Sequence, residues 1–151
     1  MPSMLGKRFY LDSNALIYFF EAHALFGPPI RTLFEFAERE QLTMVTSELS
    51  VAEVLVMPFK MQRADLVARH TAFVTTRPDF DVIALGRGIL IESARLRAER
   101  GGKLPDAIHV ATALAAGCTS FISQDLGIRA PENLKVIRIS ELPQHLPQSA
   151  P

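Results

Sequence analysis

The sequence predicts an α/β fold of three layers, with helices on both faces of a short, mostly parallel sheet of five strands. Short apolar runs alternate almost throughout with segments of helical periodicity. These runs lack strict polar–apolar alternation, which is typical of strands covered on both faces. A chain of 151 residues that is 48% hydrophobic suits one compact domain. We expect that domain to span residues 1–142, followed by a Pro-rich flexible tail at 143–151.

Five short apolar runs are expected to form the strands. They lie at residues 9–11, 42–45, 80–85, 119–122 and 135–139. In the last run, Val136 and Ile137 are expected to point inward.

The segments between these runs have the spacing of helices. Pro105 suits a first helical turn, and Gly117 suits the residue after a helix end. In the segment 59–76 the residues expected to face the core are Phe59, Leu66, Val67 and Phe73. The expected helices lie at residues 15–20, 29–40, 49–56, 59–76, 88–100 and 105–116.

Composition and charge exclude several classes of protein. The single cysteine, Cys118, excludes an internal disulfide and a zinc site built on Cys pairs. Basic and acidic side chains both number 16, so the net charge gives no argument for a polyanionic partner. Residues 60–103, however, carry nine basic and five acidic side chains. With no targeting segment and no apolar stretch of ~20 residues, we expect a cytoplasmic protein without a membrane partner.

Four acidic residues are expected at the carboxyl ends of the strands, where open α/β sheets bind ligands. Asp12 follows the first strand, and Glu53 lies in the helix after the second. Asp106 lies in the first turn of the helix before the fourth strand, and Asp125 follows that strand. Clustered carboxylates repel one another unless a cation lies between them, and Mg²⁺ prefers oxygen ligands. The sequence therefore predicts a divalent-cation site able to activate water.

Each acid also has a purely structural interpretation. Asp12 can cap the following helix, and Asp106 can complement a helix dipole. Asp125 can shape a turn, and Glu53 lies at the capping-box spacing from Ser50. Taken singly, these roles suffice for all except Glu53, whose apolar neighbours make an unpaired carboxylate costly.

Four segments carry a resemblance to a known family. They read LDSNALI at 11–17, TSELSVAEVL at 46–55, LPDAIHVATAL at 104–114 and FISQD at 121–125. In this order they resemble the PIN-domain ribonucleases, most closely the VapC-like toxins of bacterial toxin–antitoxin pairs. The resemblance spans about residues 8–139. The sequence departs from the family at Gln124 and lacks the usual aromatic residue after Asp125.

The resemblance implies a metal-dependent endoribonuclease, commonly dimeric, whose site a cognate antitoxin covers. Attack by water in line at phosphorus would leave a 5′-phosphate and a 3′-hydroxyl. Ser123, and Ser13 through its backbone or hydroxyl, would bond within the site. The residues that would bind Mg²⁺ or Mn²⁺ are Asp12, Glu53, Asp106 and Asp125.

Other residues are left with two interpretations. His109, one turn after Asp106, is either a general base or a histidine at the edge of the core. A basic segment is either an RNA-backbone contact or a solvated helix face. Helices 29–40 and 59–76 carry more apolar residues than a monomer needs, which predicts a homodimer. The basic segment contains Arg95, Arg97, Arg100 and Lys103.

Three rival functions were weighed against the nuclease. A haloacid-dehalogenase-like phosphatase requires an acid where Asn14 stands, and a receiver domain requires a Lys after the last strand, where none follows Ile139. A non-catalytic PIN-like module that binds RNA or protein stays open as the alternative.

Overall fold

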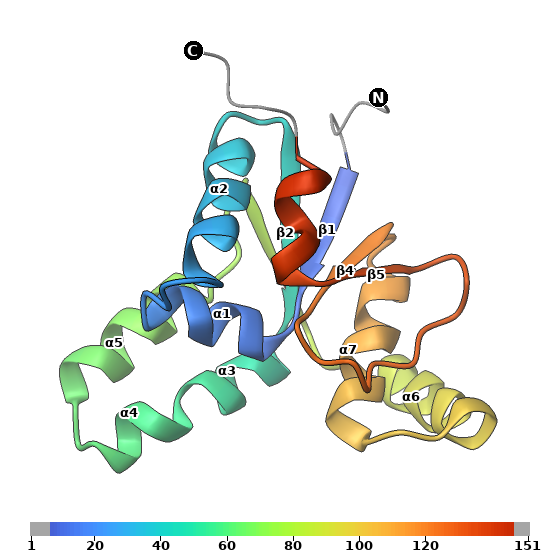
Figure 1. Cartoon of the computed structure of the whole chain (residues 1–151). Coiled ribbons are helices and arrows are strands. Elements are labelled where there is room, and N and C mark those ends of the chain that lie inside the picture. Colours follow the sequence, from blue (N-terminus) through green and yellow to red (C-terminus); the bar gives the residue numbers. More distant parts are fainter. Residues whose placement is uncertain (1–6, 147–151) are drawn as a thin grey trace.

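A computed structural model describes residues 7–146, and a sheet of five strands lies at its centre (Figure 1). In space the strands follow the order β3-β2-β1-β4-β5, and every neighbouring pair of them is parallel. The predicted fold class is thereby confirmed. The strands are β1 (Lys7–Leu11), β2 (Leu42–Ser47), β3 (Phe80–Ile83), β4 (Ser120–Ile122) and β5 (Lys135–Ile137).

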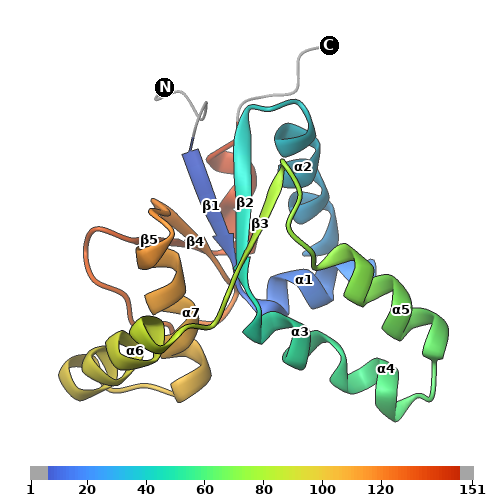
Figure 2. The ribbon, with the colours of Figure 1, turned by 180° about the vertical axis from the view of Figure 1, so that it is seen from behind.

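Helices cover both faces of the sheet. On one face lie α1 (Ser13–Phe20), α2 (Gly27–Glu38) and the 3₁₀ helix η1 (Ile139–Gln144), and on the other lie α6 (Arg87–Arg100) and α7 (Leu104–Ala115). Three short helices lead away from the end of β2 and bring the chain back to β3 (Figure 2). They are α3 (Leu49–Val54), α4 (Val56–Lys60) and α5 (Ala64–Phe73). Within residues 7–146, no helix is both long and apolar enough to cross a membrane.

Successive residues of a strand enter different cores because strand side chains alternate between the two faces. Phe9 and Leu11 pack into the core under α1 and α2, whereas Tyr10 packs into the core beside α7. Likewise Ile122 joins the first core and Phe121 the second. Packed side chains therefore cover both faces of β1 and β4 where these residues lie. This explains why residues 9–11 and 121–122 form continuous apolar runs in the sequence.

The single helix expected at 59–76 is wrong. The helical chain stops at Lys60 and restarts at Ala64, because Gln62 has a left-handed backbone with φ 54° and reverses the direction of the chain. Phe59, expected in the core, is 63% exposed, whereas Phe73 packs against the core.

Two expectations near the C-terminus also differ from the structure. Val136 is 36% exposed rather than inward, because β5 is an edge strand, while Ile137 is buried as expected. The segment expected to be a tail from Pro143 begins inside η1, and Leu146 is buried in the core. The rest of that segment, residues 147–151, lies outside the described residues.

Candidate active site

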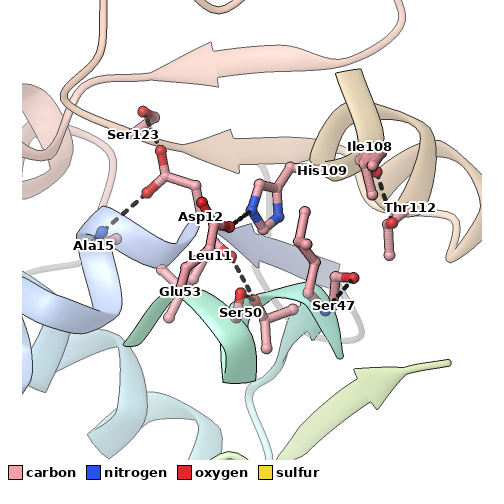
Figure 3. A network of polar contacts seen from close by, with 12 residues as sticks. Leu11, Asp12, Ala15, Ser47, Ser50, Glu53, Ile108, His109, Thr112 and Ser123 are labelled. Atoms are coloured by element: carbon pink, nitrogen blue, oxygen red, sulfur yellow. Dashed lines mark hydrogen bonds and ion pairs between the residues drawn. The ribbon is translucent and has the colours of Figure 1, made fainter. Parts of the chain in front are cut away.

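The register of β1 against β4 brings Asp12 and Ser123 together. Leu11 pairs with Ile122, so the next residue of each strand reaches the same edge of the sheet. The Ser123 hydroxyl donates to Oδ2 of Asp12 at 2.5 Å, and the Asp12 backbone N–H donates to the Ile122 carbonyl. Both side chains are buried, and Figure 3 shows how they lie in the polar network around Asp12.

Asp12 also caps α1, as its structural interpretation predicts. Its Oδ1 accepts a hydrogen bond from the Ala15 backbone N–H at 2.9 Å. The cap uses one carboxylate oxygen and Ser123 uses the other, so the orientation of this carboxylate is fixed by two elements distant in sequence.

The electrostatic environment of Asp12 favours its neutral form. Burial raises the pKa of Asp12 above its ordinary value, the hydrogen bonds from Ser123 and Ala15 offset part of the rise, and the charge of Asp106 adds to it. Among residues 7–146, no Lys or Arg forms an ion pair with Asp12, Asp106 or Asp125. An ionised Asp12 is therefore a buried charge without a protein counter-charge, which is costly.

Glu53 reaches the site from α3 and does not form the capping box considered with Ser50. Ser50 lies inside α3 and shares a hydrogen bond with Thr46, whose hydroxyl also donates to the Leu11 carbonyl. Glu53 Oε1 instead lies 2.7 Å from His109 Nε2. Burial is the largest single effect and raises the pKa of Glu53, but the hydrogen bond to His109 and the charge interaction with His109 act together against it, so that pKa lies below its ordinary value. The Ser13 hydroxyl helps to lower it.

His109 is a buried residue, only 2% exposed, that links two elements. Its Nδ1 lies 2.5 Å from the Tyr10 hydroxyl, while its Nε2 meets Glu53. With both ring nitrogens occupied, His109 does not face a substrate as a general base would. The structure agrees better with the other interpretation, a histidine at the edge of the core. That interpretation did not anticipate the contact between His109 and Glu53.

Asp106 and Asp125 form the more open side of the site. Asp106 lies in the first turn of α7 and is half-buried; burial and the charge of Asp125 raise its pKa, so the two carboxylates lie near each other. Asp125 is exposed, and its Oδ1 accepts from the Gly127 backbone N–H at 2.7 Å. Its backbone N–H donates to Ser123, which also holds Asp12.

The donor set suits a hard divalent cation. Its members are carboxylates, of which the buried Asp12 has no ion pair within the described residues, and carboxylate oxygens are the ligands that Mg²⁺ and Mn²⁺ prefer. Among residues 7–146, no three His, Cys, Asp or Glu side chains are close enough to enclose an ion by themselves. An ion held here would take one or two of these carboxylates directly and complete its shell with water, as Mg²⁺ usually does.

Sequence reasoning missed Tyr10 and Thr46, which support the site from within strands. The buried run of β1 gave no sign that the Tyr10 hydroxyl has a partner. The spacing of His109 from Asp106 was visible, but the partner of His109 was not. The single cysteine, Cys118, is buried, and burial raises its pKa to about 12.

The fold and the site define an α/β protein with an acidic centre at the carboxyl ends of a parallel sheet. The model of the PIN domain family matches residues 9–133, and the chain belongs to that family. A sequence comparison with curated proteins gave no match.

Three solved structures share the fold. VapBC2 from Rickettsia felis, bound to a DNA fragment from its promoter, aligns with a TM-score of 0.66 and 15% identity over 87% of this chain and 98% of that chain. A toxin-antitoxin complex from Klebsiella pneumoniae aligns with a TM-score of 0.60 and 23% identity over 83% and 93% of the two chains. PAE2754 from Pyrobaculum aerophilum aligns with a TM-score of 0.57 and 20% identity over 93% and 96%.

The raised pKa of Asp12 predicts a stability effect with a defined sign. The folded protein without metal holds the Asp12 proton to higher pH than the unfolded chain, so this contribution is present below the ordinary pKa of about 3.9 and is lost as pH rises. In EDTA near neutral pH, Asp12→Asn should raise the unfolding midpoint by about 2–4 °C, the shift that ~1 kcal/mol produces in a domain of this size.

Differential scanning fluorimetry across pH tests this prediction. The gain of the variant should shrink toward pH ~4, where the folded wild type holds the proton on Asp12. Adding Mn²⁺ should raise the midpoint of the wild type and leave that of Asp12→Asn unchanged. An equal response of both proteins to Mn²⁺ would show that Asp12 takes no part in binding the ion.

Proposed function

We propose that the protein is a Mg²⁺- or Mn²⁺-dependent endoribonuclease and the toxin of a toxin–antitoxin pair. PIN domains are generally nucleases. The observation that carries the proposal is the buried Asp12 carboxylate, fixed by Ser123 and Ala15 and lacking a protein cation. The other three acids complete the proposed metal site.

Each residue has a part in the proposed hydrolysis. All four acids would hold the ion, and Asp106 and Asp125, on the open side, would also orient water toward phosphorus. A bound divalent ion supplies an activated water and neutralises charge on the phosphoryl group. Ser123 keeps Asp12 and the turn at Asp125 in register through two hydrogen bonds.

The basic segment supports RNA as the substrate, with one exclusion. Arg95 is engaged by Glu92 and Glu99, so it is not free for a phosphate. Lys103 lines a small hollow beside Asp106, and Arg129 lines the same hollow from the loop after β4. Both side chains are exposed and, within residues 7–146, neither forms an ion pair. We assign the RNA backbone to this edge of the site.

An exposed apolar surface supports the proposed homodimer. The surface lies on and just after α4 rather than on α2, whose apolar residues are mostly in the core. Apolar side chains exposed in this number on one short segment mark an interaction site. Its members are Val56, Met57, Phe59 and Met61. We assign this surface to a second copy of the chain.

The structural neighbours are the reason for proposing an antitoxin as a partner. One is a toxin-antitoxin complex, and another is VapBC2. An antitoxin that covers the acidic site would keep RNA away from it. The cytoplasm is the compartment proposed for these partners.

Substitution of a proposed metal ligand should abolish cleavage. With labelled RNA and Mn²⁺, Asp12→Asn and Asp106→Asn should each lower the rate at least ~10²-fold, because a lost ligand removes charge stabilisation in the transition state. EDTA should abolish wild-type cleavage. Glu48→Gln is the matched control: Glu48 is exposed at the start of α3 and should keep the wild-type rate.

Cleavage that persists in Asp106→Asn or in EDTA would contradict the assignment. A wild-type protein that binds RNA without cutting it under any of these conditions would instead support the non-catalytic binding module.

Lys103 should contribute to RNA affinity through salt-dependent contacts. In the Asp12→Asn background, which stops cleavage, Lys103→Ala should weaken RNA binding uniformly across sequences and lower the slope of log affinity against log salt by about 1. Fluorescence anisotropy measures both quantities. Arg95→Ala, which removes a guanidinium already paired with two acids, should change neither; the opposite ranking of the two variants would refute the assigned RNA edge.

The apolar surface on α4 should control the oligomeric state. Light scattering should give twice the chain mass of 16.7 kDa for the wild type and the chain mass for Phe59→Ser. Phe59 is exposed, so the variant should fold and unfold at the wild-type temperature when both are monomeric. A monomeric wild type at micromolar concentration would remove the homodimer from the proposal.

A further inference from the structure

A row of hydrogen-bonded side chains leads from the sheet to the acidic site. It starts at Tyr10 of β1, which is fully buried, passes through His109 of α7, and ends at Glu53 of α3. Its two contacts measure 2.5 Å and 2.7 Å. Three different elements meet in this row, and only its last member reaches solvent, with 32% of the Glu53 side chain exposed.

One arrangement of the protons accounts for both contacts of this row. Burial raises the pKa of Tyr10 well above its ordinary value, so its hydroxyl keeps its proton at neutral pH. That hydroxyl lies beside Thr46 and can donate to His109 Nδ1. His109 Nε2 then carries a ring proton and donates to the Glu53 carboxylate.

This arrangement fixes Glu53 in two respects. Donation from Nε2–H favours the ionised carboxylate, and it holds the side chain in one rotamer although the side chain is partly exposed. Oε1 is used by His109, and the Ser13 hydroxyl lies close enough to lower the pKa of the same carboxyl group, whose partly exposed side chain can be reached by a ligand. Outer hydrogen bonds of this kind orient the residues that bind a metal.

We infer that His109 is a positioning residue, oriented by Tyr10, that holds the Glu53 carboxylate aimed at the divalent cation. The inference rests on the proposed function in that Glu53 is taken as a metal ligand. A histidine with only a packing role would not require its Nε2 to meet a partly exposed carboxylate. A catalytic histidine would need an exposed ring nitrogen, and His109 has none.

Nitrogen-15 NMR of the histidine rings tests the proton arrangement without any metal or RNA. The His109 ring should carry a proton on Nε2, the nitrogen that faces Glu53. In Tyr10→Phe the ring proton should no longer be confined to Nε2, because Nδ1 loses the hydroxyl against which it lies. A wild-type ring with the proton on Nδ1 would overturn the inference.

Mn²⁺ titration followed by water-proton relaxation tests the effect on the site. His109→Leu should weaken Mn²⁺ binding about 10- to 100-fold. His109→Gln should restore most of the affinity, because the glutamine amide can donate to Glu53 from the position of Nε2. Thr112→Val is the matched control: Thr112 is buried on the same helix, bonds only the Ile108 carbonyl, and should leave Mn²⁺ affinity unchanged.

The outcomes separate this inference from the proposed function. If the wild type cleaves RNA and His109→Leu, still folded, binds Mn²⁺ as tightly as the wild type, the positioning role is wrong and the nuclease stands. If Mn²⁺ affinity depends on His109 but the wild type cleaves no RNA, the positioning role stands and the nuclease falls. If the wild type binds no Mn²⁺, both fall.

Discussion

The burial of one carboxylate is the constraint on which the site depends. Asp12 lies where β1 ends, and the parallel register with β4 places Ser123 beside it. A cap on α1 and a hydroxyl from β4 satisfy its oxygens but bring no positive charge. The cost of an uncompensated buried charge is tolerated in a folded protein when a function requires it, and a bound cation would remove that cost.

The remaining acids lie on different elements around Asp12, and their side chains are fixed to different degrees. Glu53 is held from the opposite side of the sheet, through a histidine that a buried tyrosine orients. Asp106 and Asp125 lie toward solvent, and only Asp125 has a backbone partner. The site thus combines a rigid inner half, built from strand ends and α3, with an outer half able to adjust to a substrate. The cations Lys103 and Arg129 border this outer half.

The order of elements and the sheet could be predicted from sequence because each strand is a short run buried on both faces. The four acids could be placed at one edge for the same reason, since strand ends are visible in the sequence. The break in the helix at Gln62 could not be predicted, because a residue other than glycine in the left-handed conformation cannot be recognised from its residue type. The hydrogen-bond partner of Glu53 could not be predicted either. His109 follows Glu53 by 56 residues, and only the packing of α7 brings the two side chains together.

The central claim, that these acids bind a divalent cation together, is tested most directly by paramagnetic broadening with Mn²⁺. On ¹⁵N-labelled protein, substoichiometric Mn²⁺ should erase amide signals from residues 11–15, from the part of α3 around Glu53, from residues 123–127 and from the first turn of α7, and spare the rest. A second acidic group, Glu38, Glu40 and Asp79, lines a hollow of the same structure and provides the comparison. Broadening centred on that group, or spread evenly over the chain, would contradict the account.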